Sequence, residues 1–305
     1  MSVQNAIGDD IMDIGKSYLK YFTALLIFGM NGIVASYIDL SSYEIVFIRT
    51  LIGSLFLIAV LLFTKTKVHL FENKKHTLYL FISGMAMGIS WMFLYEAYRR
   101  TGVGFASLVY YCGPVFVMIL SPLLFREKLT WSKAVRFLAV IAGMLCLNLR
   151  ALSDGKTSLG IICGILSAIM FSVMLICNKK TGIVAGLENT TWQLLVAFLT
   201  VAVFVGVKQG FVMHIKPGSV LPILILGIFN TGIGCYFYFS SIGHLPIQTV
   251  AVCGYLEPLS AVLFSMLLLH ESLAIVQVAG IVLIFAGTAF GELFHFYRSR
   301  VPVSL

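Results

Sequence analysis

Apolar residues along this chain gather in long uninterrupted runs, and the polar positions fall mostly in the short segments between them. A helix needs about 20 apolar residues to cross a bilayer, and ten runs meet this requirement. The runs lack the polar–apolar alternation of outer-membrane barrel strands. The pattern therefore predicts an all-α membrane protein with ten transmembrane helices. They span roughly 18–37, 43–63, 78–98, 105–125, 132–150, 158–178, 190–207, 221–241, 249–269 and 275–295.

The second half of the chain repeats the first at a constant spacing. Pro258 lies 144 residues after Pro114, and Glu271 lies 144 residues after Glu127. The same offset aligns further positions of the two halves without a gap. These include Gly88 with Gly232, Phe93 with Phe237, Tyr111 with Tyr255, and Ser121 with Ser265.

The duplication divides the predicted helices into two sets of five, at 18–150 and 158–295. An odd number of crossings makes the second set enter the membrane from the opposite side, so we expect two inverted five-helix repeats. Segment 1–17 becomes an N-terminal cytoplasmic segment and 296–305 a cytoplasmic tail. Inverted repeats are typical of transporters, whose site lies between the two halves.

Composition supports the membrane assignment and leaves no room for a soluble domain. Hydrophobic residues make up 59% of the chain and charged residues 11%, where a soluble protein has about a quarter. The mean hydropathy is +0.98. The connections between the predicted helices are mostly short.

The net charge of +8 comes from residues at the membrane faces and does not indicate nucleic-acid binding. With residue 1 in the cytoplasm, thirteen Lys and Arg residues fall in cytoplasmic segments and six on the opposite side. Positive charge marks the cytoplasmic face. We therefore expect a protein of the cytoplasmic membrane with both termini inside.

The sequence contains no pattern typical of an enzyme or a metal site. The six cysteines lie in or beside apolar runs and have no CxxC spacing, so they read as small buried residues. No His, Asp or Glu cluster has metal-ligand spacing, and no nucleophile–base pair is evident. We predict no catalytic residue, no metal and no cofactor.

Several short segments, taken together, carry a family resemblance. Residues 95–101 (YEAYRRT), 111–116 (YCGPVF) and 126–130 (REKLT) resemble the EamA family of the drug/metabolite transporter superfamily. Residues 47–49 (FIR) do so as well, and Glu257-Pro258 with residues 270–273 (HESL) repeat the signature in the second half. The resemblance covers about 18–295.

The resemblance implies transport of small molecules, often amino acids and related metabolites and frequently by export. It does not imply one substrate. The first repeat departs from the second at one telling position, because Gly113 stands where the second repeat has Glu257.

Glu257 and Asn230 are the polar residues that stand near the middle of predicted spans. A mid-membrane charge costs roughly 2.5–3.5 kcal/mol and therefore usually faces protein or water. Pro258 follows Glu257, as Pro114 follows Gly113, and a proline interrupts helical hydrogen bonding. We expect helix breaks at both prolines and a substrate site lined by Glu257 and Asn230. The alternative is a kink with a structurally bonded glutamate.

Aromatic residues supply further candidates for the site. Trp91 and Tyr95 are four residues apart and share a helix face, and Tyr111 and Tyr255 lie at equivalent depth near the two prolines. Aromatic faces can hold a cationic group. The alternative for each residue is packing, or a position at headgroup depth.

Arg49 and Glu96 are predicted at similar depth on the external side. We expect them to form an ion pair that closes the outer entrance. The alternative is that both are interfacial, with Arg49 extending to the headgroups. If Arg49 pairs with Glu96, Glu257 remains and the cavity is mildly acidic.

These observations predict a secondary transporter that moves a small polar metabolite, an amino acid or amine, by alternating access. Export is the expected direction, and a proton is the candidate coupling ion. The expected partners are the substrate and the lipid bilayer, with the protein a monomer or homodimer. A channel-like facilitator and a non-transporting membrane scaffold or partner subunit remain as alternatives.

Overall fold

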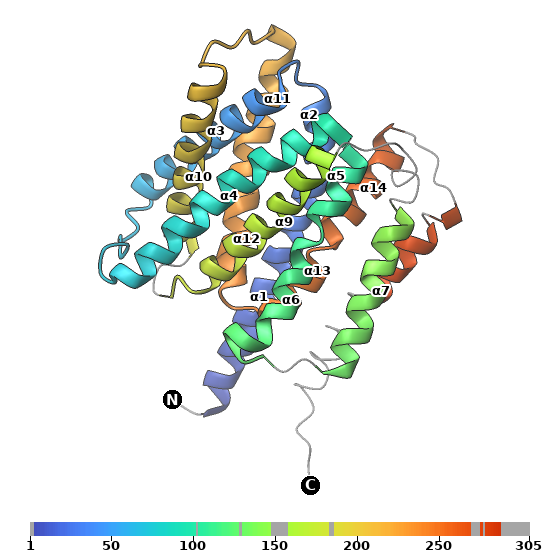
Figure 1. Cartoon of the computed structure of the whole chain (residues 1–305). Coiled ribbons are helices and arrows are strands. Elements are labelled where there is room, and N and C mark those ends of the chain that lie inside the picture. Colours follow the sequence, from blue (N-terminus) through green and yellow to red (C-terminus); the bar gives the residue numbers. More distant parts are fainter. Residues whose placement is uncertain are drawn as a thin grey trace.

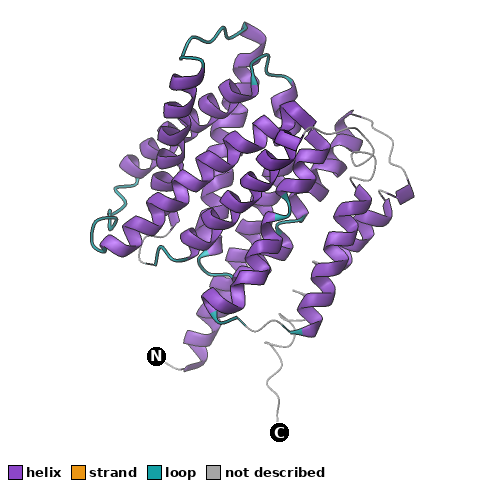
Figure 2. Ribbon diagram, in the orientation of Figure 1, coloured by secondary structure: helices purple, strands orange, loops and turns teal. Residues whose placement is uncertain are grey.

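The computed structural model describes residues 3–101, 103–127, 130–147, 158–182, 186–269, 275–276 and 278–287. All regular structure among them is helical, and no strand occurs in this part of the chain (Figure 2). Among the described residues, seven helices are long and apolar enough to cross a membrane. The prediction of an all-helical membrane protein is confirmed, whereas the count of ten spans and the inverted repeat remain predictions. Glu271 and segment 296–305 lie outside the described residues.

The first half of the chain forms antiparallel helices joined by short loops (Figure 1). Helix α3 begins with a capping box, in which Ser41 and Glu44 each bond the other's main-chain nitrogen, at 3.4 and 2.7 Å. The elements are α1 (Val3–Gly29), α2 (Asn31–Ser36), α3 (Ser42–Phe63), α4 (Lys74–Thr101), α5 (Val103–Tyr110), α6 (Gly113–Phe125) and α7 (Trp131–Leu147).

The second half contains one long irregular segment that the sequence pattern did not predict. Predicted span 221–241 is assembled from three short elements, and its centre, Ile225–Ile233, is π-helical. The elements are α9 (Ser158–Lys179), α10 (Gly186–Lys208), η1 (Pro217–Ser219), α11 (Val220–Leu224), η2 (Ile225–Ile233), α12 (Gly234–Ile242), α13 (Ile247–Cys253) and α14 (Leu256–Leu269).

The spans that contain Pro114 and Pro258 are both interrupted. The predicted span 105–125 breaks between α5 and α6, and the span 249–269 breaks between α13 and α14. Pro114 and Pro258 sit in the first turn of the helix that follows each break. Proline has no N–H to donate and is tolerated in a first turn, so each helix restarts just before its proline.

The long helices pack in a bundle in which helices of one half contact helices of the other. α4 lies against α9, and α1 lies against α12. α3 contacts both α10 and η2, and α6 contacts α13. The main apolar core sits among these helices, with Tyr21, Leu25 and Leu194 buried in it. α7 stands at one edge of the bundle (Figure 1).

Candidate substrate cavity

A cavity of about 450 Å³ lies among helices of both halves. Its wall is formed by residues of α1 to α6 from the first half and of α9, α12, α13 and α14 from the second half. Its lining is rich in aromatic side chains. They are Tyr21, Phe28, Trp91, Tyr95, Tyr98, Tyr110, Tyr111, Phe171, Tyr238 and Phe239.

The cavity brings together most, but not all, of the residues singled out from the sequence. Those that line it are Arg49, Trp91, Tyr95, Tyr111, Pro114 and Glu257. Those outside its lining are Glu96, Asn230, Tyr255 and Pro258.

Glu257 lies in the first turn of α14, immediately after the helix break, and is half-buried with its side chain toward the cavity. The Tyr111 side chain lines the same cavity and interacts with the Glu257 carboxyl group. The positive charge of Arg49 acts on the same group. The acidic residue Glu257 and the basic residue Arg49, from different halves of the chain, therefore line one cavity.

Arg49 is held by two contacts deep in the bundle. Its side chain is 6% exposed, and its Nε donates to the Thr231 hydroxyl oxygen at 3.0 Å. The guanidinium carbon lies 4.9 Å from the centroid of the Trp91 ring, within cation–π distance. Trp91 thus contributes both to the cavity wall and to the placement of the cation.

Asn230 and Tyr255, predicted as substrate ligands, are used in bonds between helices. Asn230 is 1% exposed and donates from Nδ2 to the Ile27 carbonyl of α1 at 2.9 Å. Tyr255 is also 1% exposed and donates to the Tyr111 carbonyl at 2.7 Å. A buried polar group needs such a partner. The apolar pattern indicates the depth of these residues in the membrane but not their direction around the helix.

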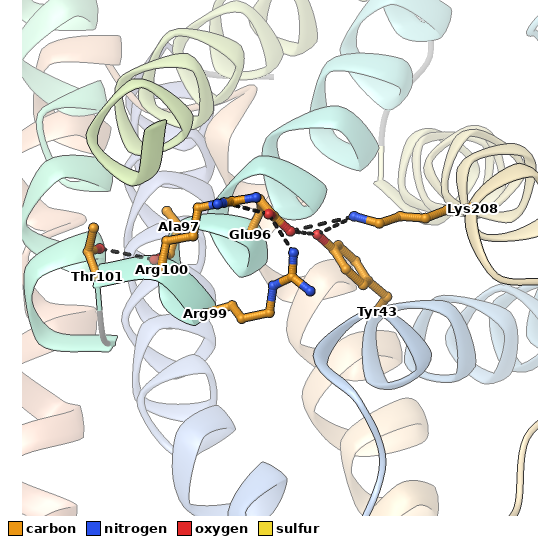
Figure 3. Close-up of polar contacts among 7 residues, drawn as sticks. All are labelled: Tyr43, Glu96, Ala97, Arg99, Arg100, Thr101 and Lys208. Carbon is orange, nitrogen blue, oxygen red and sulfur yellow. Dashed lines mark hydrogen bonds and ion pairs between the residues drawn. The ribbon is translucent and has the colours of Figure 1, made fainter. Parts of the chain in front are cut away.

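The ion pair predicted between Arg49 and Glu96 is not formed. Glu96 instead accepts hydrogen bonds from Arg99 Nη2 and Arg100 Nε, both at 2.7 Å, and lies 3.5 Å from Lys208 Nζ (Figure 3). The Tyr43 hydroxyl also donates to Glu96 and accepts from Lys208 at 2.9 Å.

The reason for this difference is the axial position of Arg49. Tyr43 is the residue of α3 that meets Glu96, and Arg49 follows it by six residues. At 1.5 Å per residue, Arg49 lies about 9 Å further along the helix, beyond the reach expected for the pair. Arg49 is consequently a residue of the cavity, and the cavity is not the mildly acidic one that the pairing would have left.

Toward the end of the bundle opposite Glu96, polar contacts hold α12 and α13. The Tyr21 hydroxyl donates to the Val250 carbonyl at 2.7 Å. Lys179 Nζ donates to the carbonyls of Ile242 and Gly243 at 2.9 Å each, and also contacts that of Leu245.

Glu127 holds the other end of the same connection. Its carboxylate accepts from the main-chain nitrogens of Ile247 and Gln248 at 2.8 and 3.2 Å, where α13 begins. Lys179 and Glu127 therefore satisfy the last carbonyls of α12 and the first N–H groups of α13, respectively.

Gly113, the departure of the first repeat, is explained by close packing. A Cβ atom at this position would lie 2.7 Å from Phe171 Cδ1 and 3.0 Å from the Ala168 carbonyl oxygen. The contact between α6 and α9 therefore has no space for a second carboxylate opposite Glu257. Within the described part of the chain, no group of three or more His, Cys, Asp or Glu residues could hold a metal.

The sequence reasoning missed several residues that the structure places in these networks. Thr231, Tyr43, Lys179 and Lys208 are ordinary polar residues near span ends or within a Gly-rich run. Asn230, Thr231 and Gly232 form one short polar break in an apolar span, and this is the signal that could have pointed to Thr231.

The sequence profile of the EamA-like transporter family matches the chain twice, over residues 15–149 and 158–291. The chain belongs to the EamA-like transporter family. This assignment confirms the resemblance drawn from the sequence and makes the protein a multi-pass membrane transporter rather than an enzyme.

Named relatives of this EamA-like transporter agree with the assignment. "Uncharacterized transporter YxxF" of Bacillus subtilis (strain 168) is 26% identical over 277 residues, covering 89% of this chain and 88% of that protein. "Protein PecM" of Dickeya dadantii (strain 3937) is 26% identical over 214 residues, covering 68% and 71%. A solved crystal structure superposes with a TM-score of 0.76 at 20% identity, covering 91% of this chain and 98% of its own. This likeness shows the same fold.

Proposed function

We propose that this transporter moves an amino acid or a related amine across the cytoplasmic membrane by alternating access, in the direction of export. The observation that carries the proposal is that Arg49 and Glu257 line one cavity of about 450 Å³. An amino acid has a carboxylate and an ammonium group, which complement these two side chains. The residues therefore suit a zwitterion better than a substrate of one charge.

The size and walls of the cavity support a small substrate. Ligand pockets typically enclose about 300–1,000 Å³ and combine apolar walls with a few polar groups. Aromatic side chains supply most of the walls here, and their faces attract an ammonium group. A phosphorylated substrate would need more cations at depth, and its second charge would face Glu257.

The contacts between the halves support inverted repeats and hence alternating access. Shifted by 144 positions, the pair Arg49 and Thr231 corresponds to Gln193 and Met87. Those two residues also touch, with Gln193 Nε2 4.0 Å from Met87 Sδ. Likewise, the contact of α4 with α9 corresponds to that of α12 with α1. Equivalent contacts in both halves are what a two-fold relation requires.

The ends of the cavity support an outward-facing arrangement. With both termini in the cytoplasm, Ala35, Ser42 and Arg99 belong to the external ends of their helices, and all three line the cavity. The end at which Lys179 and Glu127 hold α12 and α13 then faces the cytoplasm. Glu257 is an ionisable group in the cavity, so we propose the proton as coupling ion.

The decisive experiment is counterflow with purified protein in liposomes. Vesicles preloaded with one unlabelled compound are exposed to the same radiolabelled compound, for a panel of amino acids and polyamines. We expect saturable counterflow of at least one amino acid, and its loss in both Arg49→Gln and Glu257→Gln. Glu44→Gln is the matched control, because Glu44 caps α3 outside the cavity lining.

Other outcomes would overturn the proposal. Non-saturable flux without counterflow would indicate a channel-like facilitator. The absence of flux for every compound in the panel, with folded protein, would favour a scaffold or partner subunit. Unaltered counterflow in Arg49→Gln would exclude the zwitterion site.

A further inference from the structure

We infer that Thr231, together with the π-helical segment η2 that carries it, is the positioning residue that holds Arg49 toward the substrate carboxylate. This inference rests on the proposed function. It assigns a role to a residue that does not line the cavity and whose importance the sequence did not indicate.

The Thr231 hydroxyl is oriented to receive Arg49. Thr231 is fully buried, and its hydroxyl donates to the Leu226 carbonyl at 2.7 Å. Once the hydroxyl proton is committed to Leu226, the oxygen lone pairs face Arg49 Nε, which donates at 3.0 Å. The Leu226 carbonyl, the Thr231 hydroxyl and Arg49 Nε thereby form a chain of two hydrogen bonds from η2 to α3.

The terminal N–H groups of the Arg49 guanidinium can donate to a ligand in the cavity. Among the described residues, its hydrogen bonding uses Nε, while the planar group lies over Trp91. The remaining guanidinium N–H groups have the forked geometry that binds a carboxylate in two parallel hydrogen bonds. The hydrogen bond from Nε to Thr231 and the contact with the Trp91 ring together fix one orientation of these N–H groups.

The π-helix is what brings Thr231 to this position. Leu226 is five residues before Thr231, which is the spacing of a π-helix, whereas an α-helix pairs residues four apart. The neighbouring residue, Asn230, is bonded to α1 through the Ile27 carbonyl. Adjacent residues of η2 are thus joined to α1 and to α3. π-helical turns are rare and occur frequently at functional sites.

The corresponding position in the other half shows that helix packing does not need this polar pair. Gln193 and Met87 hold the equivalent places, and their contact is a weak one with sulfur at 4.0 Å. A neutral pair therefore serves at the packed contact between α4 and α10. The two pairs differ in the longer side chain: Arg49 lines the cavity, whereas Gln193 does not and accepts a hydrogen bond from Asn178 at 3.2 Å.

The test compares Thr231→Val, which keeps the shape but removes the hydroxyl, with Thr231→Ser, which keeps the hydroxyl. The probes are the amino acid that gives the strongest counterflow in the panel and the amine formed by removing its carboxyl group. We expect Thr231→Val to raise KM for the amino acid about tenfold, the order of one hydrogen bond to a charged group, and to leave KM for the amine unchanged. Thr231→Ser should restore most of the loss.

Two controls separate this inference from the proposed function. Thr200→Val removes a comparable hydroxyl, bonded to the Val196 carbonyl at 2.8 Å in α10, and should change neither KM. If Arg49→Gln raises KM for the amino acid but Thr231→Val does not, the positioning role is wrong and the proposed site stands. If Arg49→Gln has no effect, the proposed function itself fails.

A second measurement needs no substrate. With Trp131 and Trp192 replaced by Phe, the emission of Trp91 reports the cation above its ring. Thr231→Val should shift this emission, and Thr231→Ser should not. If Thr231→Val does not fold, Thr231→Ala takes its place in both measurements. Unchanged emission in a folded variant without the hydroxyl would overturn the inference.

Discussion

The hydroxyl of Tyr255 donates a hydrogen bond to the main-chain carbonyl of Tyr111, with 2.7 Å between the two oxygens. The two tyrosines hold corresponding positions in the two halves of the chain, 144 residues apart. Their ring centroids are 6.2 Å apart. Each residue lies at the interruption of a span, three residues before a proline, so the bond joins the two helix breaks.

Loss of this bond should reduce stability by about 1–3 kcal/mol, because Tyr255→Phe leaves the Tyr111 carbonyl buried without its donor. The free energy of unfolding in detergent, measured with denaturant, tests the expectation. Tyr236→Phe is the control, since Tyr236 is half-buried and contacts the neighbouring ring of Phe237. If both variants lose the same free energy of unfolding, the hydrogen bond between the two helix breaks does not contribute to stability.

The broad fold could be predicted because it rests on properties that each segment carries by itself. Apolar length identifies a span, and a proline identifies an interruption wherever it lies. The constant offset between Pro114 and Pro258 exposes the duplication without any knowledge of contacts. Family membership, drawn from short motifs, is confirmed by the two matched segments.

The site could be predicted only in part, because sequence gives depth along a span better than direction around it. Trp91 and Glu257 were expected to line the site and do line the cavity, whereas Arg49 was expected at the outer entrance and lines the cavity instead. Asn230 has suitable depth but points to α1, and this direction depends on the π-helical turn. A π-helix has no recognisable period in the sequence, so the polar break at Asn230, Thr231 and Gly232 marks a position of interest but does not predict the contact of Thr231 with Arg49.

Glu257→Gln should keep the fold and reduce transport of the amino acid at least about tenfold. The amide fills similar volume and can still interact with the Tyr111 side chain, but it has no charge for the substrate's ammonium group. Counterflow and the response to an imposed pH gradient measure the two consequences. We expect both to fall, while Glu44→Gln leaves both intact. Normal counterflow with a normal pH response would place Glu257 in a structural role.

The network around Glu96 should show measurable coupling between its members and none with Arg49. Glu96→Gln removes the negative charge shared by Arg99, Arg100 and Lys208 (Figure 3) and should lower stability. Because these groups are partly exposed, we expect a loss of about 1 kcal/mol or less for each pair.

A pair of double-mutant cycles measures this coupling. Glu96→Gln with Lys208→Met should give a double variant that is more stable than the sum of the single losses predicts. Glu96→Gln with Arg49→Gln should be additive within error, since the two residues belong to separate networks. Coupling in the second cycle would revive the outer ion pair that the structure does not form.

The end of the bundle where Lys179 holds α12 should open when this residue loses its charge. Lys179 holds three carbonyls at the end of α12, and a hydrogen bond from a charged donor is stronger than one from a neutral donor. Lys179→Met should therefore shift the population toward the state open to the cytoplasm. The reporter is a single cysteine at Ala251, which lines the cavity from α13, in a background without the six native cysteines.

We expect this cysteine to react about tenfold faster with an impermeant maleimide applied to inside-out vesicles, and more slowly in right-side-out vesicles. Lys180→Met is a close control, because Lys180 is the next residue and lies over the rings of Tyr79 and Phe125 instead of holding α12. It removes the same charge from the same end of the bundle and should leave both rates unchanged. Equal acceleration by the two variants would assign the effect to surface charge, and acceleration from the external side alone would reverse the proposed orientation of the protein in the membrane.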